Sequence, residues 1–364
     1  APLRRLSGAG PRTAEARSHG RMRSTAVCLA GLLRLLPEVG PSIQAFLVAP
    51  LDADLFISGP VDDLSAWVSA LALFPTLAQV RLERENVTQF LRNAGGSSLG
   101  WRLAARVKGN WLGCLEGEEA DMRRRGSGLC QMYGHKQCME MVEDREAKRG
   151  QLYQHVVYSR PDFKWLGPHL PLALLPEGES DFWVIDGEDN GGLNDRHWVM
   201  PRRMVPELLG SWGRLLDGSL AELFVPQGLP ELSTETHFSF YLSTTGTNRL
   251  IRRIPSMAFV PCANPHARKQ IDMSATGWDD SGRIDNVNVR CERGGPKYRH
   301  EYRHARHVAD CVGDRPWSLP LLWECWCAPK EDTNMFQYSE YRLCMHAKMA
   351  AAGWKGRLTF MEEE

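Results

Sequence analysis

Two acidic segments, each following an apolar run, carry the residues whose types and spacing could do chemistry. In the first, Arg160 and Asp162 follow the run at residues 153–158. A carboxylate can hold a divalent cation against a diphosphate, and a guanidinium can neutralise a departing phosphate. The same two side chains are equally compatible with a surface ion pair in a charged turn. These residues alone therefore do not identify a ligand site.

The second segment, residues 186–196, follows the apolar run at 181–186 and holds four acids and two amides among its first ten residues. So many oxygens repel one another unless a cation or hydrogen-bond donors lie between them, and the glycines let the backbone approach a ligand closely. A solvated acidic turn is the alternative. An EF-hand calcium loop is disfavoured, because its twelfth position would be His197 and not a bidentate glutamate.

Two clusters near the C-terminus give weaker signals. His300, His304 and His307 lie at helical spacing and could form a zinc site, but the arginines between them favour a solvated basic face. Cys325 and Cys327 are too close for an ordinary local disulfide, so each sulfur is expected to pair elsewhere or to stay buried. The sequence has no phosphate-loop or dinucleotide-binding motif, which excludes the common kinase-like and dehydrogenase classes.

The strands and helices that position these two acidic segments are predicted from apolar runs that alternate with helical patterns. Repeated strand-helix units predict an α/β fold with a mostly parallel sheet flanked by helices. Ligands of open α/β sheets bind beyond the carboxyl ends of strands, which is where both acidic segments are expected. Residues 92–128 have no firm period and are predicted to be loop with short helices. The predicted strands are residues 25–31, 52–58, 153–158, 181–186 and 249–262, and the predicted helices are residues 32–50, 62–74, 129–150, 233–246 and 297–310.

The bulk composition excludes several classes of partner. The chain has 364 residues, of which 43% are hydrophobic and 24% charged, enough for one large domain or two ordinary ones. Its 44 basic and 44 acidic residues balance, so no global field favours nucleic acid or an anionic membrane. No run approaches the roughly 18 to 20 apolar residues of a membrane span.

The cysteines and one glycosylation sequon favour an oxidising compartment. The ten cysteines are even in number and lack the paired CxxC spacing of a zinc module. Disulfides are therefore expected, with buried free thiols as the alternative. The sequon at Asn86 points the same way.

Composition divides the chain into three predicted regions. Residues 1–23 carry six arginines and one acid, and they are expected to form a flexible basic leader or stem outside the fold. Residues 24–262 form the α/β domain. Residues 263–364, rich in Arg, His, Trp and Cys, form a C-terminal extension pinned by cysteines.

The order of these elements resembles a glycosyltransferase-like family of plants and algae, whose domain is similar to the GT-A nucleotide-sugar fold. The resemblance covers roughly residues 24–262, and its most specific pieces are YxxVVYSRPD, which begins at Tyr153, and GGLNDR, which begins at Gly191. It implies an enzyme that moves a hexose or pentose from a nucleotide sugar to a hydroxyl of a glycan or glycoprotein acceptor. It also implies the secretory lumen, in the Golgi, whereas the basic leader leaves organellar import as an alternative.

The same resemblance implies roles for single residues. In GT-A enzymes a DxD motif at a strand end binds Mn2+ or Mg2+ and the sugar diphosphate, and the segment ending at Asp162 occupies that place here. Asp162 is therefore the implied metal ligand, although Arg160 stands where the first acid would be. The literal DxD at Asp52 and Asp54 precedes a strand and is given no such role. The implied donor-binding residues are Gly31, Arg34, Arg160, Asp162, Asp186, Asp189, Asn194 and Arg196, and the implied catalytic bases are Asp195 and Glu235.

Two further functions remain open from the residues alone. The incomplete DxD and the cysteine-bearing extension are compatible with a catalytically inactive binding or structural module. A glycoside hydrolase is a more distant alternative, because acids on one loop do not define the carboxylate separation which that chemistry needs.

Overall fold

The structure is a computed structural model, and it describes most of the chain. The residues that it describes are 22–31, 33, 35–60, 68, 71–83, 87–95, 99–104, 106–115, 128–176, 181–224, 226, 232–262, 295–328 and 342–353. Arg34, Asn86 of the sequon and most of the predicted helix at 62–74 lie outside these residues.

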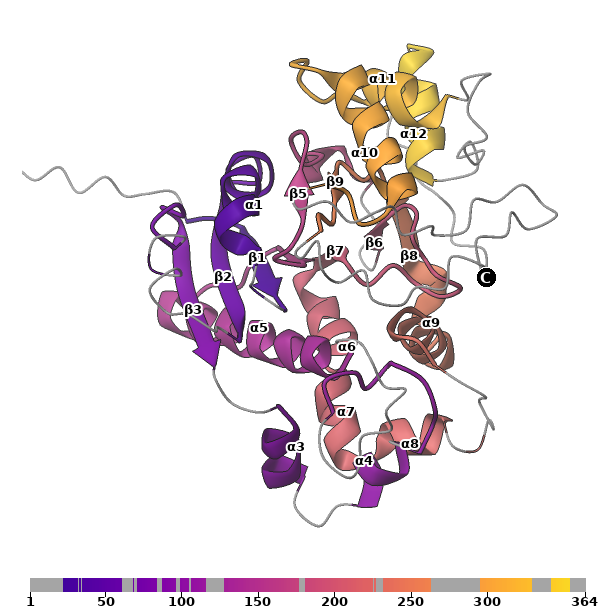
Figure 1. The fold of residues 1–364 in the computed structure, drawn as a ribbon. Coiled ribbons are helices and arrows are strands. Elements are labelled where there is room, and N and C mark those ends of the chain that lie inside the picture. Colours follow the sequence, from indigo (N-terminus) through magenta and orange to yellow (C-terminus); the bar gives the residue numbers. More distant parts are fainter. Residues whose placement is uncertain are drawn as a thin grey trace, which may run out of the picture.

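A seven-stranded mixed sheet forms the centre of the molecule (Figure 1), in the order β3-β2-β1-β4-β7-β6-β8. The pairs β1 with β2, β1 with β4, β2 with β3, and β6 with β8 are parallel. Only β7 runs against its neighbours β4 and β6 among the paired strands of this sheet. The strands are β1 (Thr25–Ala30), β2 (Ala53–Pro60), β3 (Leu77–Glu83), β4 (His155–Ser159), β6 (Phe182–Ile185), β7 (His197–Pro201) and β8 (Ile251–Ile254). The predicted α/β class with a mostly parallel sheet flanked by helices is confirmed.

Both faces of the sheet are covered by apolar side chains. All six residues of β1 are buried, and alternate residues point to opposite faces, as in any strand. Val27 and Leu29 join one core with α1 and the C-terminal helices, whereas Ala26 and Cys28 join a second core with α5 and the helices after β7. A strand buried on both faces reads as a continuous apolar run, which is why the sequence identified β1 directly.

The helices form the two outer layers. On one side lie α1 (Leu36–Ile43), a π-helical turn (Gln44–Val48), α10 (Arg299–Val312), α11 (Leu319–Leu322) and α12 (Arg342–Ala351). On the other lie α3 (Val87–Gly95), α4 (Leu99–Ala104), α5 (Gly128–Arg149), α6 (Val205–Leu209), α7 (Ser211–Asp217), α8 (Ser219–Phe224) and α9 (Thr234–Thr244). None of the helices in the described part of the chain is both long and apolar enough to span a bilayer.

The helix and strand predictions at the site are confirmed, with one addition and one correction. The helix predicted at 233–246 is α9, capped by the Ser233 side chain, which accepts from the Thr236 N–H at 3.1 Å. β7 was not predicted. The single strand predicted at 249–262 is wrong: it is divided into β8 and the short β9 (Ala258–Phe259), which pairs instead with β5 (Lys164–Trp165). Pro255, which has no N–H to donate to a ladder, follows β8 directly.

Disulfides connect the elements of both layers, and every cysteine among the described residues is paired. Cys28 of β1 is bonded to Cys138 of α5, and Cys114 to Cys130. After residue 262, Cys311 pairs with Cys325 and Cys327 with Cys344. The expectation that Cys325 and Cys327 pair elsewhere is thus confirmed, and such bonds are consistent with an oxidising secretory lumen.

Candidate functional site

The two acidic segments meet at one edge of the sheet because β7 runs antiparallel to β4. His197, the first residue of β7, is opposite Ser159, the last residue of β4. The contact continues beyond the strands, where the Arg160 N–H donates to the Arg196 carbonyl at 2.9 Å. The carboxyl ends of β4 and β6 and the start of β7 therefore surround one site, as expected for an open α/β sheet.

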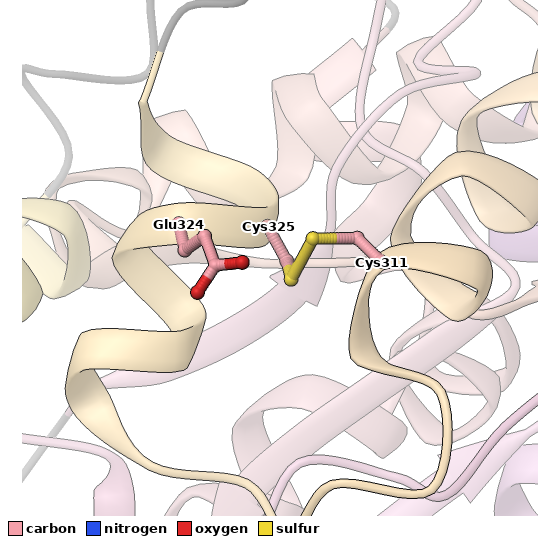
Figure 2. Close-up of side chains that lie close together, drawn as sticks. All are labelled: Cys311, Glu324 and Cys325. Carbon is pink, nitrogen blue, oxygen red and sulfur yellow. A yellow bond between two sulfur atoms is a disulfide. The ribbon is translucent and has the colours of Figure 1, made fainter.

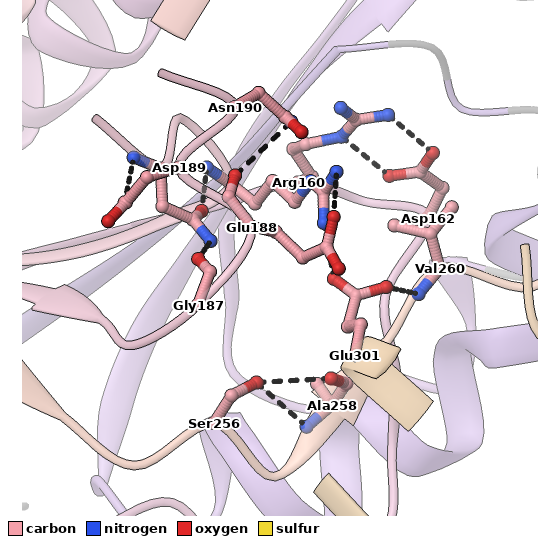
Figure 3. A network of polar contacts seen from close by, with 12 residues as sticks. Arg160, Asp162, Gly187, Glu188, Asp189, Asn190, Ser256, Ala258, Val260 and Glu301 are labelled. Carbon is pink, nitrogen blue, oxygen red and sulfur yellow. Dashed lines mark hydrogen bonds and ion pairs between the residues drawn. The ribbon is translucent and has the colours of Figure 1, made fainter. Parts of the chain in front are cut away.

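Arg160 and Asp162 bind each other side by side. Arg160 Nε donates to Asp162 Oδ1 at 3.0 Å and Nη2 donates to Oδ2 at 2.8 Å (Figure 3). The Asp162 carboxylate is buried, whereas the Arg160 side chain is 23% exposed. Burial would raise the pKa of Asp162, but the charge of Arg160, with smaller effects of Lys297 and Arg196, holds this pKa below its usual value. Asp162 is therefore a permanent anion that orients Arg160.

Arginines lie against the acids of the loop at 186–196. Arg253 of β8 donates to Asp189 through both terminal nitrogens, at 2.9 Å to Oδ1 and 2.8 Å to Oδ2. Glu188 has a buried side chain, and its Oε2 lies 3.8 Å from Arg196 Nη2. The mutual repulsion expected from the sequence is relieved by these guanidinium groups.

Asn194 fixes the shape of the loop through hydrogen bonds of its backbone and its side chain. Its backbone N–H donates to Asp189 Oδ1 at 2.9 Å, and its side-chain amide donates to the Gly187 carbonyl at 2.5 Å. Its Oδ1 accepts from the Arg196 N–H at 3.0 Å. The resemblance assigns Asn194 to the donor site, and in the structure each of these three groups has a partner within the loop.

The loop also packs on the first turn of α9, which brings Glu235 to the site. The Leu193 N–H donates to the Glu235 carbonyl at 3.0 Å. A Cβ at Gly192 would lie 2.2 Å from the Glu235 backbone, so this contact requires glycine. Asn190 Nδ2 donates to Glu235 Oε1 at 2.8 Å. Glu235 is therefore held at the loop by a side-chain and a main-chain hydrogen bond.

Asp195 is the buried carboxyl group at the centre of these contacts. It is 4% exposed, and Gln131 Nε2 of α5 donates to its carbonyl at 2.6 Å and to the Tyr158 hydroxyl at 3.1 Å. Burial raises the pKa of Asp195; the charge of Arg160 opposes this increase and that of Glu235 adds to it. A carboxyl group with a raised pKa is a stronger base than an ordinary one, and such groups are frequent at active sites.

Arg196 connects the loop to the C-terminal helices. Its Nη1 donates to Glu301 Oε1 of α10 at 2.6 Å, and both side chains are almost completely buried. The guanidinium carbon lies 4.5 Å from the centre of the Tyr298 ring, a cation-π distance. The second Glu301 oxygen accepts from the Val260 N–H at 2.9 Å (Figure 3). Arg196 therefore has a structural partner and presents little surface to a ligand.

The remaining predicted residues lie at the same edge or outside the described residues. Gly31 follows β1 with φ +138°, and a Cβ there would lie 3.3 Å from Pro161 Cδ, so the ends of β1 and β4 are packed together. Asp186 follows β6, and its N–H donates to the Ile254 carbonyl at 2.9 Å. Nothing is described for Arg34.

The donor set at Asp162 does not fit a divalent cation. Both carboxylate oxygens accept from Arg160, and the position two residues earlier supplies a cation where a second acid would be needed. Among the described residues, the group of three possible metal ligands lies elsewhere, at Cys311, Glu324 and Cys325. Figure 2 shows that the two sulfurs of that group are joined in a disulfide, so neither is a thiolate ligand.

The literal DxD at Asp52 and Asp54 lies at the opposite end of the sheet, where β2 begins. Asp54 accepts from the Tyr153 hydroxyl at 2.6 Å and from Arg23 Nη1 at 3.2 Å, and Arg149 Nη1 lies 3.7 Å away. This motif is part of a structural ion-pair network. Arg23 is the last residue of the predicted basic leader, and its side chain contacts the folded domain here.

Four residues of the site could not be found from the sequence: Gln131, Arg253, Lys297 and Glu301. Gln131 lies on α5, Arg253 on β8 and Glu301 on α10, and Lys297 lies just before α10. The Arg196–Glu301 and Gln131–Asp195 contacts span 105 and 64 positions. Gln131, Arg253 and Lys297 are of common residue types, and no local motif marks them. Glu301 lies within the HExxH run that begins at His300, but that run does not indicate a pairing with Arg196.

Comparisons with known proteins identify no family for this chain. No family model matches the sequence, and no curated protein matches it. A crystal structure of mouse xyloside xylosyltransferase 1 in its apo form is similar with a TM-score of 0.35 and 9% identity, over 64% of this chain and 84% of that chain. A likeness this weak carries no argument about activity.

Proposed function

We propose that this protein is a glycosyltransferase that moves a sugar from a nucleotide-sugar donor to a hydroxyl of a glycan or glycoprotein acceptor. The observation that carries the proposal is Asp195, a buried carboxyl group with a raised pKa beside Glu235 and within the field of Arg160. Its position at the carboxyl edge of the sheet is where ligands of this fold class bind. The resemblance of the strand-end and loop segments to a glycosyltransferase-like family supports the same class.

In the proposed reaction, the Asp195 carboxylate accepts the proton of the acceptor hydroxyl while that oxygen forms a bond to the anomeric carbon. The bond from this carbon to the diphosphate oxygen breaks, and the nucleoside diphosphate leaves with the electron pair. Arg160, oriented by Asp162, neutralises the charge that develops on the leaving group. Glu235 keeps the pKa of Asp195 high through its negative charge.

The test is turnover of a panel of nucleotide sugars by the Asp195→Asn variant. Asparagine keeps the shape and removes the base, so we expect turnover to fall by about 100-fold or more with donor binding retained in calorimetry. Asp310→Asn on α10, an exposed carboxylate paired with Arg306, is the matched control and should leave turnover unchanged. Near-wild-type turnover by Asp195→Asn would contradict the assignment.

A binding module is a second candidate, because Arg160 and Asp162 already satisfy each other in a bidentate ion pair. In that case nucleotide sugars would bind to the wild-type protein without being hydrolysed or transferred. Calorimetry with the same panel, followed by product analysis, separates the two functions.

The proposed location is the Golgi lumen, and secretion of a tagged full chain with its disulfides intact is the corresponding check.

A further inference from the structure

Lys297 lies beside the site although it belongs to the region after residue 262. It lies two residues before the first residue of α10, and its backbone N–H donates to the Val260 carbonyl at 2.8 Å. Its Nζ lies 5.0 Å from the centre of the Tyr298 ring, the same ring that Arg196 contacts at 4.5 Å. Two cations therefore share one aromatic ring at this edge of the sheet.

The cations at this edge differ in whether a carboxylate is paired with them. Arg196 is paired with Glu301, and Arg160 is paired with Asp162. In contrast, Lys297 forms no ion pair with any residue that the structure describes, and it is half-buried. Its charge acts on Asp162 from a distance, together with those of Arg160 and Arg196. A divalent cation beside Asp162 would be repelled by the charges of Arg160, Lys297 and Arg196, whereas an anion there would be attracted by them.

We propose that Lys297 binds the diphosphate of the donor at the place where a divalent metal would otherwise neutralise it, so that this site works without Mn2+ or Mg2+. The inference rests on the proposed glycosyltransferase function. It assigns a role in the site to the region after residue 262, which the sequence resemblance does not cover.

Arg160 can contribute to the same anion without leaving Asp162. Its Nε and Nη2 are engaged by the carboxylate, whereas Nη1 has no partner among the described residues. A guanidinium has five N–H donors in a fixed plane, so one edge can hold Asp162 while Nη1 faces a phosphate oxygen. The diphosphate thus meets an ammonium and a guanidinium, and both stabilise the charge that it gains as the sugar leaves.

Inorganic pyrophosphate is the probe, measured by calorimetry at fixed ionic strength with EDTA or with MnCl2. We expect binding by the wild-type protein to be unchanged by EDTA. Lys297→Met should weaken binding by about tenfold or more, because it removes one charge-assisted contact, and Lys297→Arg should restore most of it. Lys348→Met is the matched control, since Lys348 also lies over an aromatic ring, Trp323 at 5.7 Å, but on α12.

The outcomes separate this inference from the proposed function. Binding that requires Mn2+, or equal binding by wild type and Lys297→Met, overturns the inference even if sugar transfer is observed. Pyrophosphate binding that depends on Lys297 and survives EDTA supports the inference. If that binding is accompanied by no binding or turnover of any nucleotide sugar, the anion site stands and the glycosyltransferase function fails.

Discussion

The buried ion pair between Arg196 and Glu301 gives the sharpest test of how the region after residue 262 is attached to the site. Arg196 Nη1 and Glu301 Oε1 are 2.6 Å apart, and the two side chains are 2% and 3% exposed. Glu301→Gln keeps the shape of the side chain and removes its charge. The buried Arg196 guanidinium then loses its nearest counter-ion, while Val260 keeps an acceptor for its N–H.

The expected cost follows from this geometry. Removing one partner of a buried ion pair typically costs about 3–5 kcal/mol of unfolding free energy, because an uncompensated charge is left inside the protein. Glu188 lies 3.8 Å from the other terminal nitrogen of Arg196 and remains as a weaker counter-ion. We therefore expect Glu301→Gln to cost about 3 kcal/mol, the lower end of that range. Arg196→Met should cost at least as much, since Glu301 then loses its cation.

The assay is a double-mutant cycle measured by denaturant unfolding at pH 7 with the disulfides intact. If the pair acts as a unit, the double variant Arg196→Met/Glu301→Gln should be far more stable than the sum of the two single changes predicts, with a coupling of about 3 kcal/mol. The matched control is Arg306–Asp310 on the same helix, at 2.7 Å but more than half exposed, where about 0.5 kcal/mol is expected. Additive effects at Arg196 and Glu301, or a coupling equal to that of the control, would refute the reasoning.

Two further predictions concern stability. The buried His237 has its pKa lowered to about 3 by desolvation, so the unfolded chain binds its proton more readily and stability falls as the pH drops below about 6.5. His237→Phe should reduce that slope by about 1.4 kcal/mol per pH unit between pH 6 and 4 in unfolding titrations. The bond between Cys28 and Cys138 spans 110 residues and that between Cys114 and Cys130 spans 16. Replacing both cysteines of the longer pair by alanine should cost about 1.7 kcal/mol more than the same change in the shorter pair.

Each of these two predictions has its own control. For the acid dependence, His346→Phe on α12 serves, because His346 is less buried and should change the slope much less. An unchanged slope in His237→Phe would show that this histidine is not kept neutral by the fold. For the disulfides, equal losses of stability in the two pairs would show that loop length does not set their contribution.

Local patterns in the sequence were sufficient for the elements that bury a continuous or regularly spaced set of side chains. β1 and β6 are buried on both faces and read as unbroken apolar runs, and α9 begins at a capping serine. β7 was missed because the loop before it dominates the local pattern. Its antiparallel direction depends on which strands it joins, β4 and β6, and single-strand patterns do not encode that choice.

For the candidate site, the sequence by itself determined that acidic segments follow two buried strands and that Asp162, Asp195 and Glu235 carry the carboxylates. These are local facts, since residue type and strand periodicity are read from neighbouring positions. Only the tertiary structure decided which acid pairs with which cation. Asp162 pairs with Arg160, Asp189 with Arg253, and Glu301 with Arg196. The charge of a carboxylate, and hence its ability to bind a metal or accept a proton, depends on burial and on groups up to 105 positions away. That dependence on contacts distant in sequence is why the sequence favoured a metal at Asp162 while the folded chain surrounds it with cations.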